Sequence, residues 1–100
     1  MAIWTVYLVR CSDDTLYCGI TNDLAARLAA HDAGKGAKYT RGRGPLRLVA
    51  QQRTRDKRVA LRIEHAVKKL DRRRKLTLDA TQLAAMAAVA RKKLRDTARQ

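Results

Sequence analysis

The chain has 100 residues, which is enough for one domain with a small core, and that core must be mostly aliphatic because the sequence has no Phe, one Trp and three Tyr. Its 23 Lys and Arg against 9 Asp and Glu give a net charge of +14. This charge indicates a polyanionic partner, and it favours nucleic acid over an anionic membrane surface. No apolar run approaches the roughly 20 residues of a spanning helix. The N-terminal sequence lacks the pattern of a signal peptide, so we expect a cytoplasmic protein.

Two β-strands are predicted at the start, over residues 3–11 and 15–20. Both segments are rich in β-branched and aromatic residues, and Ser12-Asp13-Asp14 between them has the chemistry of a tight turn. The pair is therefore interpreted as a hairpin, with Tyr7 and Val9 on the same face of its first strand.

Two cysteines, Cys11 and Cys18, are seven residues apart. They have neither the spacing of a zinc site nor a second pair to form a disulfide framework, although paired strands would bring them near one another. We interpret them as reduced, semi-buried thiols of a cytosolic protein.

A helix is predicted from Thr21-Asn22-Asp23, capped by Thr21 or Asn22, to the glycines at 34 and 36. Arg27 and His31 lie four residues apart and therefore on one side of this helix. A basic loop with four glycines follows over residues 33–45, and a third strand begins at Leu46 and extends to Arg53.

A second helix is predicted over residues 55–70, with an apolar stripe facing the sheet. Glu64, the only glutamate of the chain, falls roughly 115° from the centre of that stripe at about 100° per residue. A basic run follows at 68–75, and a last helix begins at Asp79 or Thr81, Ala-rich to Ala90 and basic beyond it. The stripe consists of Val59, Ile63, Ala66, Val67 and Leu70.

Five side chains, Tyr7, Tyr17, Arg27, His31 and Glu64, are the parts needed to cut a phosphodiester bond around a metal ion. Each taken alone has an ordinary interpretation: the tyrosines as core, Arg27 and His31 as surface residues, and Glu64 as a partner for a lysine four residues on.

The pattern resembles the GIY-YIG nucleases. Val6-Tyr7-Leu8 stands where these have Gly-Ile-Tyr, with the tyrosine one place earlier, and Tyr17-Cys18-Gly19 stands at Tyr-Ile-Gly. Arg27, His31 and Glu64 match later family positions. The resemblance covers residues 3 to about 76 and is closest to the small stand-alone bacterial YhbQ-like branch. It implies an α/β (α+β) domain with a small, mainly antiparallel three-stranded sheet flanked by helices, over residues 1–76, with 77–100 a basic helix continuing the same domain.

The resemblance also implies roles. Glu64 would hold one Mg²⁺ or Mn²⁺ ion, Arg27 would grip the phosphate, and Tyr17 would act as general base or water-positioning group. Tyr7 would position water or phosphate, and His31 would shuttle a proton or bind phosphate. The implied activity is metal-dependent endonucleolytic hydrolysis of DNA, structure-specific for branched or damaged substrates, in repair or recombination.

The remaining basic residues predict a nucleic-acid surface that contacts phosphates without reading sequence. DNA is favoured over RNA, and no small-molecule cofactor is expected. A protein partner or weak homodimer stays open, as does the alternative of a non-catalytic nucleic-acid-binding protein on the same scaffold. The expected binding residues are Lys35, Lys38, Tyr39, Arg41, Arg43, Lys68, Lys69, Arg72 and Arg73.

Overall fold

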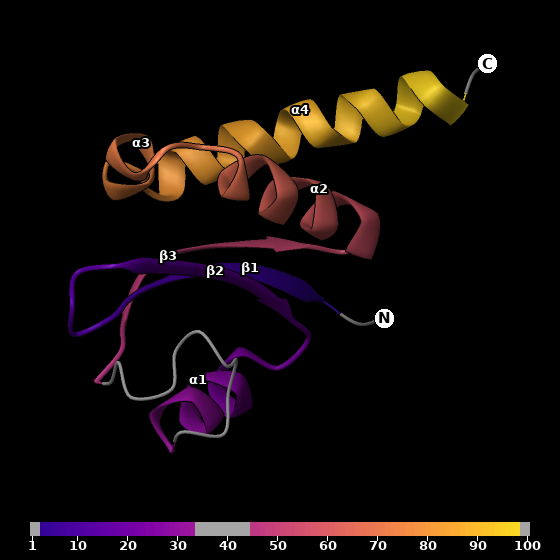
Figure 1. Cartoon of the computed structure of the whole chain (residues 1–100). Coiled ribbons are helices and arrows are strands. Elements are labelled where there is room, and N and C mark those ends of the chain that lie inside the picture. The colour runs from indigo at the N-terminus through magenta and orange to yellow at the C-terminus, as the bar shows by residue number, and fades with distance from the viewer. Residues whose placement is uncertain (1–2, 34–44, 99–100) are drawn as a thin grey trace.

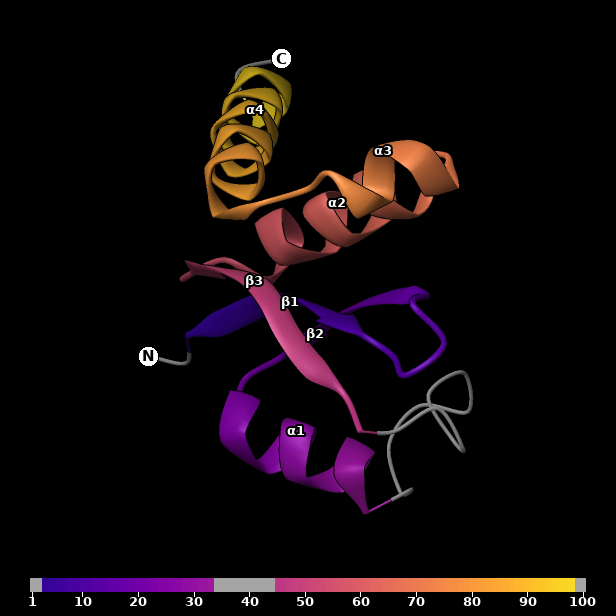
Figure 2. The same ribbon diagram turned by 90° about the vertical axis from the view of Figure 1, so that its left-hand side faces the viewer.

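A computed structural model describes residues 3–33 and 45–98 of the chain. In this part, an antiparallel sheet of strand order β2-β1-β3 is covered by helix α1 on one face and by α2 and α4 on the other (Figures 1 and 2). The predicted α+β class with a small antiparallel sheet is confirmed. The strands are β1 (Trp4–Arg10), β2 (Leu16–Thr21) and β3 (Arg47–Thr54). The helices are α1 (Leu24–Asp32), α2 (Lys57–Lys68), α3 (Arg72–Leu76) and α4 (Ala80–Ala98).

The β1–β2 hairpin sets the register of the sheet. Asp14, at the turn, has a φ of 64°, and the backbone N–H of Cys11 donates to the carbonyl of Thr15 at 2.8 Å. The resulting antiparallel register pairs Tyr7 with Gly19. Because successive side chains of a strand alternate between faces, β1 carries one apolar row to α2 and α4 and another row to α1.

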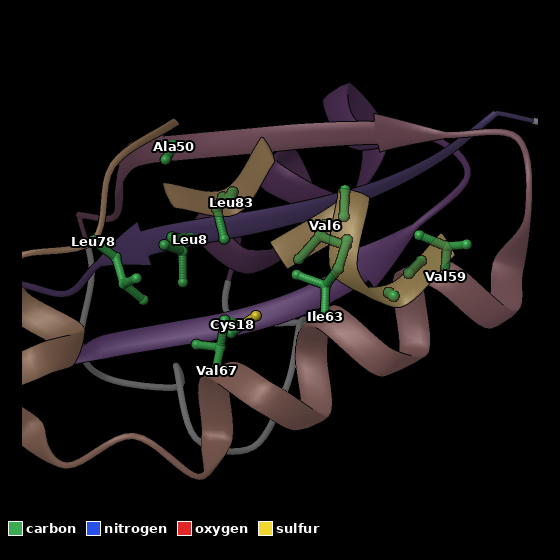
Figure 3. Close-up of a cluster of buried hydrophobic side chains, with 12 residues drawn as sticks. Val6, Leu8, Cys18, Ala50, Val59, Ile63, Val67, Leu78 and Leu83 are labelled. Carbon is green, nitrogen blue, oxygen red and sulfur yellow. The ribbon is translucent and has the colours of Figure 1, made fainter. Parts of the chain in front are cut away.

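The main apolar core lies between the sheet and the helices α2 and α4 (Figure 3). From the sheet, Val6, Leu8 and Cys18 point into it, and Ile63 and Val67 meet them from α2. The core side of α2 differs from the predicted stripe at three positions. Ala66 and Leu70 are only half-buried, whereas Ala60 is fully buried. At about 100° per residue, exchanging Ala66 for Ala60 turns the buried face of α2 toward Glu64.

Capping side chains fix where the helices begin. Asp23 caps α1, since its Oδ1 accepts the backbone N–H of Ala26 at 3.1 Å, which corrects the prediction of Thr21 or Asn22 as the cap. Thr21 instead accepts the N–H of Asp23. Asp79 and Gln82 cap α4 reciprocally, each side chain accepting the other's backbone N–H.

The short helix α3 was not predicted. The Oδ1 of Asp71 accepts the backbone N–H of Arg74 at 2.9 Å and starts a single helical segment within the basic run. This segment turns the chain between α2 and α4 and sets basic side chains beside the β1–β2 hairpin.

Helix α4 packs against α2 and β3 and completes the core. Leu83 and Ala87 have no exposed surface, and Ala90 is 5% exposed. Within residues 3–33 and 45–98, no helix is both long enough and apolar enough to cross a membrane.

Candidate active site

A hydrogen-bonded network joins strand β1 to helix α1. The Nε–H of Arg27 donates to the Tyr7 hydroxyl oxygen at 3.3 Å, and that hydroxyl lies 2.9 Å from Nε2 of His31. Arg27 and His31 are one helical turn apart on α1, so both reach the same phenol. Tyr7 has no exposed surface and His31 is 2% exposed. The network therefore forms a second, polar buried cluster on the face of the sheet opposite the main core.

Gly19 provides the space that the Tyr7 ring occupies. It is the cross-strand partner of Tyr7, and a Cβ built on it would lie 2.5 Å from the phenol oxygen and 2.6 Å from Cζ. Only a residue without a side chain fits there while the phenol keeps its place. The register thus pairs the tyrosine of the first triplet with the glycine of the second.

Tyr17 stands at the edge of the network. Its ring centroid is 6.2 Å from that of Tyr7 and 5.5 Å from that of His31, in tilted arrangements that aromatic rings favour. A hydrogen bond with Tyr17 also raises the pKa of Arg27, after the larger effect of Tyr7. Tyr17 is half-buried, unlike Tyr7 and His31. It is thus the member of the three that solvent or a substrate can reach.

Burial and the Arg27 charge shift the pKa values of the two buried members of the network. Burial raises the pKa of Tyr7, although its hydrogen bond from Arg27 opposes this, and burial together with the nearby Arg27 charge lowers the pKa of His31. At neutral pH the phenol and the imidazole are both uncharged. Arg27 can only donate, so the Tyr7 hydroxyl oxygen accepts its Nε–H, and the same hydroxyl shares a hydrogen bond with Nε2 of His31 whose donor is set by the imidazole tautomer. This arrangement holds the guanidinium, whose five N–H groups outnumber its hydrogen bonds to Tyr7 and Tyr17.

Glu64 is placed on α2, which covers the other face of the sheet from α1 (Figure 1). Its side chain is 21% exposed, and its Oε2 lies 3.8 Å from Nζ of Lys68. The Glu64 charge also contributes, after burial, to the rise in the pKa of Cys18 to about 12. Glu64 therefore lies close to Cys18 of β2, on the face of the sheet that α2 covers and not on the face that α1 covers. Hydrogen bonds and ring contacts join four of the five predicted residues, while Glu64 comes from α2 on the other face of the sheet.

A hollow lies beside β2, with Tyr17 among its lining residues. Its volume is about 300 Å³, and its walls include Leu8 and Val67, each 1% exposed. The more exposed lining residues, Tyr17, Lys68 and Lys75, form its mouth. Lys75 was not among the predicted site residues. The available signal was Asp71, whose capping of α3 places Lys75 on a helix rather than in an extended basic run.

The donor set at Glu64 suits a hard, well-hydrated cation. In residues 3–33 and 45–98 no three His, Cys, Asp or Glu side chains gather into a metal cluster. Mg²⁺ is often held by only one or two carboxylates and keeps its waters or takes phosphate oxygens, whereas zinc sites need three or four protein ligands. Glu64 fits the first case, with Lys68 as a competing partner.

The predicted binding residues of the glycine-rich loop fall outside the described residues. These are Lys35, Lys38, Tyr39, Arg41 and Arg43. The other four predicted residues, Lys68, Lys69, Arg72 and Arg73, are exposed at the end of α2 and the start of α3. Cys11 and Cys18 are buried free thiols.

Comparison with known proteins identifies the family of this chain. The family model of the GIY-YIG catalytic domain matches residues 3–77. A UPF0213 protein of Cronobacter sakazakii is 48% identical over 84 residues, which are 84% of this chain and 88% of the relative. The UPF0213 protein YhbQ of Salmonella arizonae is 47% identical over 75 residues, 75% of each chain. The solution NMR structure of the UPF0213 protein BH0048 from Bacillus halodurans has 45% identity and a TM-score of 0.50, with 84% of each chain covered. The chain therefore belongs to the GIY-YIG family of nuclease-type catalytic domains, in its small stand-alone YhbQ-like branch.

Proposed function

We propose that this protein is a metal-dependent endonuclease that hydrolyses phosphodiester bonds in DNA. The observation that carries the proposal is the network of Arg27, Tyr7 and His31, which fixes a guanidinium beside the half-buried Tyr17. The net charge of +14 supports a polyanionic substrate. Branched or damaged DNA is the expected substrate, in repair or recombination.

Arg27 is the proposed phosphate ligand. Its Nε is engaged by Tyr7, so the terminal guanidinium nitrogens are the ones that donate to the non-bridging oxygens of the phosphate. These bonds strengthen as negative charge builds up on the phosphate during attack. Holding the guanidinium in advance removes the cost of ordering a long side chain at that moment.

Tyr17 is the proposed contact for the attacking water. Tyr7 and His31 are buried, so they act as positioning residues through Arg27 and Tyr17 rather than by touching the substrate. The water oxygen bonds to phosphorus as the bond to the leaving oxygen breaks. The proton lost by the water and the proton gained by the leaving oxygen are exchanged with solvent. Glu64 would hold Mg²⁺ or Mn²⁺, which when bound neutralises charge on the phosphate and the leaving oxygen.

The test is cleavage of a panel of single-stranded, duplex, flap and junction DNAs with Mg²⁺, Mn²⁺ or EDTA. We expect metal-dependent products from the wild type and a loss of at least about 100-fold in Arg27→Gln, the scale on which removal of a charge-stabilising donor acts. Glu64→Gln should be similarly impaired. The matched control is Asp96→Asn, which removes an exposed carboxylate of α4 and should cleave normally.

The alternative is a nucleic-acid-binding protein without hydrolytic activity. The position of Glu64 across the sheet and its pairing with Lys68 favour it. It predicts tight, salt-sensitive binding of DNA or structured RNA that Glu64→Gln does not weaken, and no products in the presence of any divalent ion. Products that persist undiminished in both Arg27→Gln and Glu64→Gln would contradict the endonuclease proposal, because a contaminating nuclease would then explain them.

A further inference from the structure

Two neighbouring hollows lie along β2 between Tyr17 and the β1–β2 turn. The β2 hollow adjoins a second hollow of about 200 Å³, and the two share Leu16 and Lys75 as lining residues. The second hollow is also lined by Arg72, from the start of α3. We call the two hollows together the β2 trough, with Tyr17 at one end and Arg72 toward the other.

The trough is positively charged along its length. Among the described residues, Lys68, Lys75 and Arg72 line it, with Lys68 3.8 Å from Glu64, and the carboxylate that lines it, Asp14, is 3.9 Å from Arg10. Arg10 is the cross-strand partner of Leu16, and its Nε is buried with no hydrogen-bond partner among the described residues. A row of separate cations beside an apolar floor suits a chain of phosphates better than a single compact anion.

We propose that the β2 trough binds the phosphates that flank the cleaved bond on one side, so that the substrate strand leaves Arg27 and Tyr17 along β2 and α3. The proposal rests on the function proposed above, since that function places the scissile phosphate at Arg27. It assigns Lys75 and Arg72 to phosphate binding, and it makes the unpredicted helix α3 part of the substrate surface. The ligand is the sugar-phosphate backbone of one nucleic-acid strand, recognised without base contacts.

The first experiment measures binding of a fluorescent single-stranded hexanucleotide in EDTA, where no cleavage occurs, as a function of salt. It compares the double variant Arg72→Gln/Lys75→Gln with Arg91→Gln/Lys92→Gln on α4, which removes the same pair of charge types from exposed positions outside the trough. Two lost phosphate contacts should lower the slope of log K against log salt by about 1.4. We expect this drop in the trough variant and less than half of it in the control. Equal drops in both variants, or none in the trough variant, would overturn the proposal. Thermal melts establish that both variants are folded.

The second experiment locates the strand relative to the cut. Substrates each carry one neutral methylphosphonate within three positions of the cleaved bond, and KM is measured with Mg²⁺. A neutral linkage on one side should raise KM for the wild type and have a smaller effect on the trough variant, because the contact is already missing. Equal effects in the two proteins would refute the trough. Absence of cleavage refutes the proposed function alone, and the salt-dependent binding then decides about the trough by itself.

Discussion

Replacing Gly19 by alanine should displace the Tyr7 ring and break its hydrogen bonds with Arg27 and His31. The added methyl group would lie 2.5 Å from the Tyr7 oxygen, so the ring must retreat by about 0.9 Å to reach ordinary contact at 3.4 Å. The hydroxyl is held by bonds of 2.9 Å to His31 and 3.3 Å from Arg27, and such a movement takes them beyond hydrogen-bond range. Overpacking costs about 1–3 kcal/mol, and an unsatisfied buried polar group costs about 1–3 kcal/mol more. We expect Gly19→Ala to lower the free energy of unfolding by about 2–6 kcal/mol.

Urea denaturation of a double-mutant cycle measures this effect. Tyr7→Phe alone removes the hydroxyl and takes from Nε2 of His31 its hydrogen bond with Tyr7, at a cost of about 1–3 kcal/mol. In Gly19→Ala/Tyr7→Phe the same hydrogen bonds are lost only once, and the closest clash is relieved. The double variant should therefore be at least about 1 kcal/mol more stable than the sum of the single effects predicts. Strict additivity, or a Gly19→Ala effect below about 0.5 kcal/mol, would refute the packing of Tyr7 on Gly19.

Three further predictions concern the buried groups. Because burial lowers the pKa of His31, the unfolded chain binds a proton more readily, so stability is lost as pH falls through about 6.5. The urea midpoint should depend less on pH between 5 and 7.5 in His31→Gln, and an unchanged dependence contradicts a neutral His31. The pKa of Cys18, about 12, predicts that iodoacetamide at pH 8 modifies it only after unfolding, measured by mass spectrometry in a Cys11→Ser background. Rapid modification of the folded protein would refute its burial. Leu83→Ala on α4 should cost about 2–5 kcal/mol in urea denaturation, whereas Val89→Ala, at a 54% exposed position of the same helix, should change stability by under about 0.5 kcal/mol. Similar costs for the two would count against the docking of α4.

The elements of the fold could be predicted from local patterns, whereas their arrangement could not. Alternation and turn chemistry gave the hairpin to within two residues, and the helical spacing of Arg27 and His31 correctly set both on one side of α1. The helix α3 was missed because a single short helix has no apolar period. Its one local signal is the cap Asp71.

In the candidate site too, some residue positions follow from local spacing and others depend on how the elements pack. That Tyr7 reaches both Arg27 and His31 follows from strand alternation combined with helix spacing, two local rules. The position of Glu64 depends instead on which face of the sheet α2 covers, and no spacing within the sequence specifies that. The role of Gly19 depends on the cross-strand register, which the turn at Asp14 sets. Arg72 and Lys75 line the β2 trough because they belong to α3. Since α3 was not predicted, the sequence showed these residues only as part of a basic run.

Helix α4 begins after the last residue of the family match at 77, yet Leu83 and Ala87 are completely enclosed by the rest of the protein. The segment that matches the family is thus not an interchangeable module in this chain. A chimera that joined residues 3–77 to the tail of another relative would fold only if that tail offered α2 and β3 apolar side chains at the same helical positions. The buried positions of α4 are for this reason constrained by α2. A substitution at the contact in one helix should be accepted only with a compensating substitution in the other.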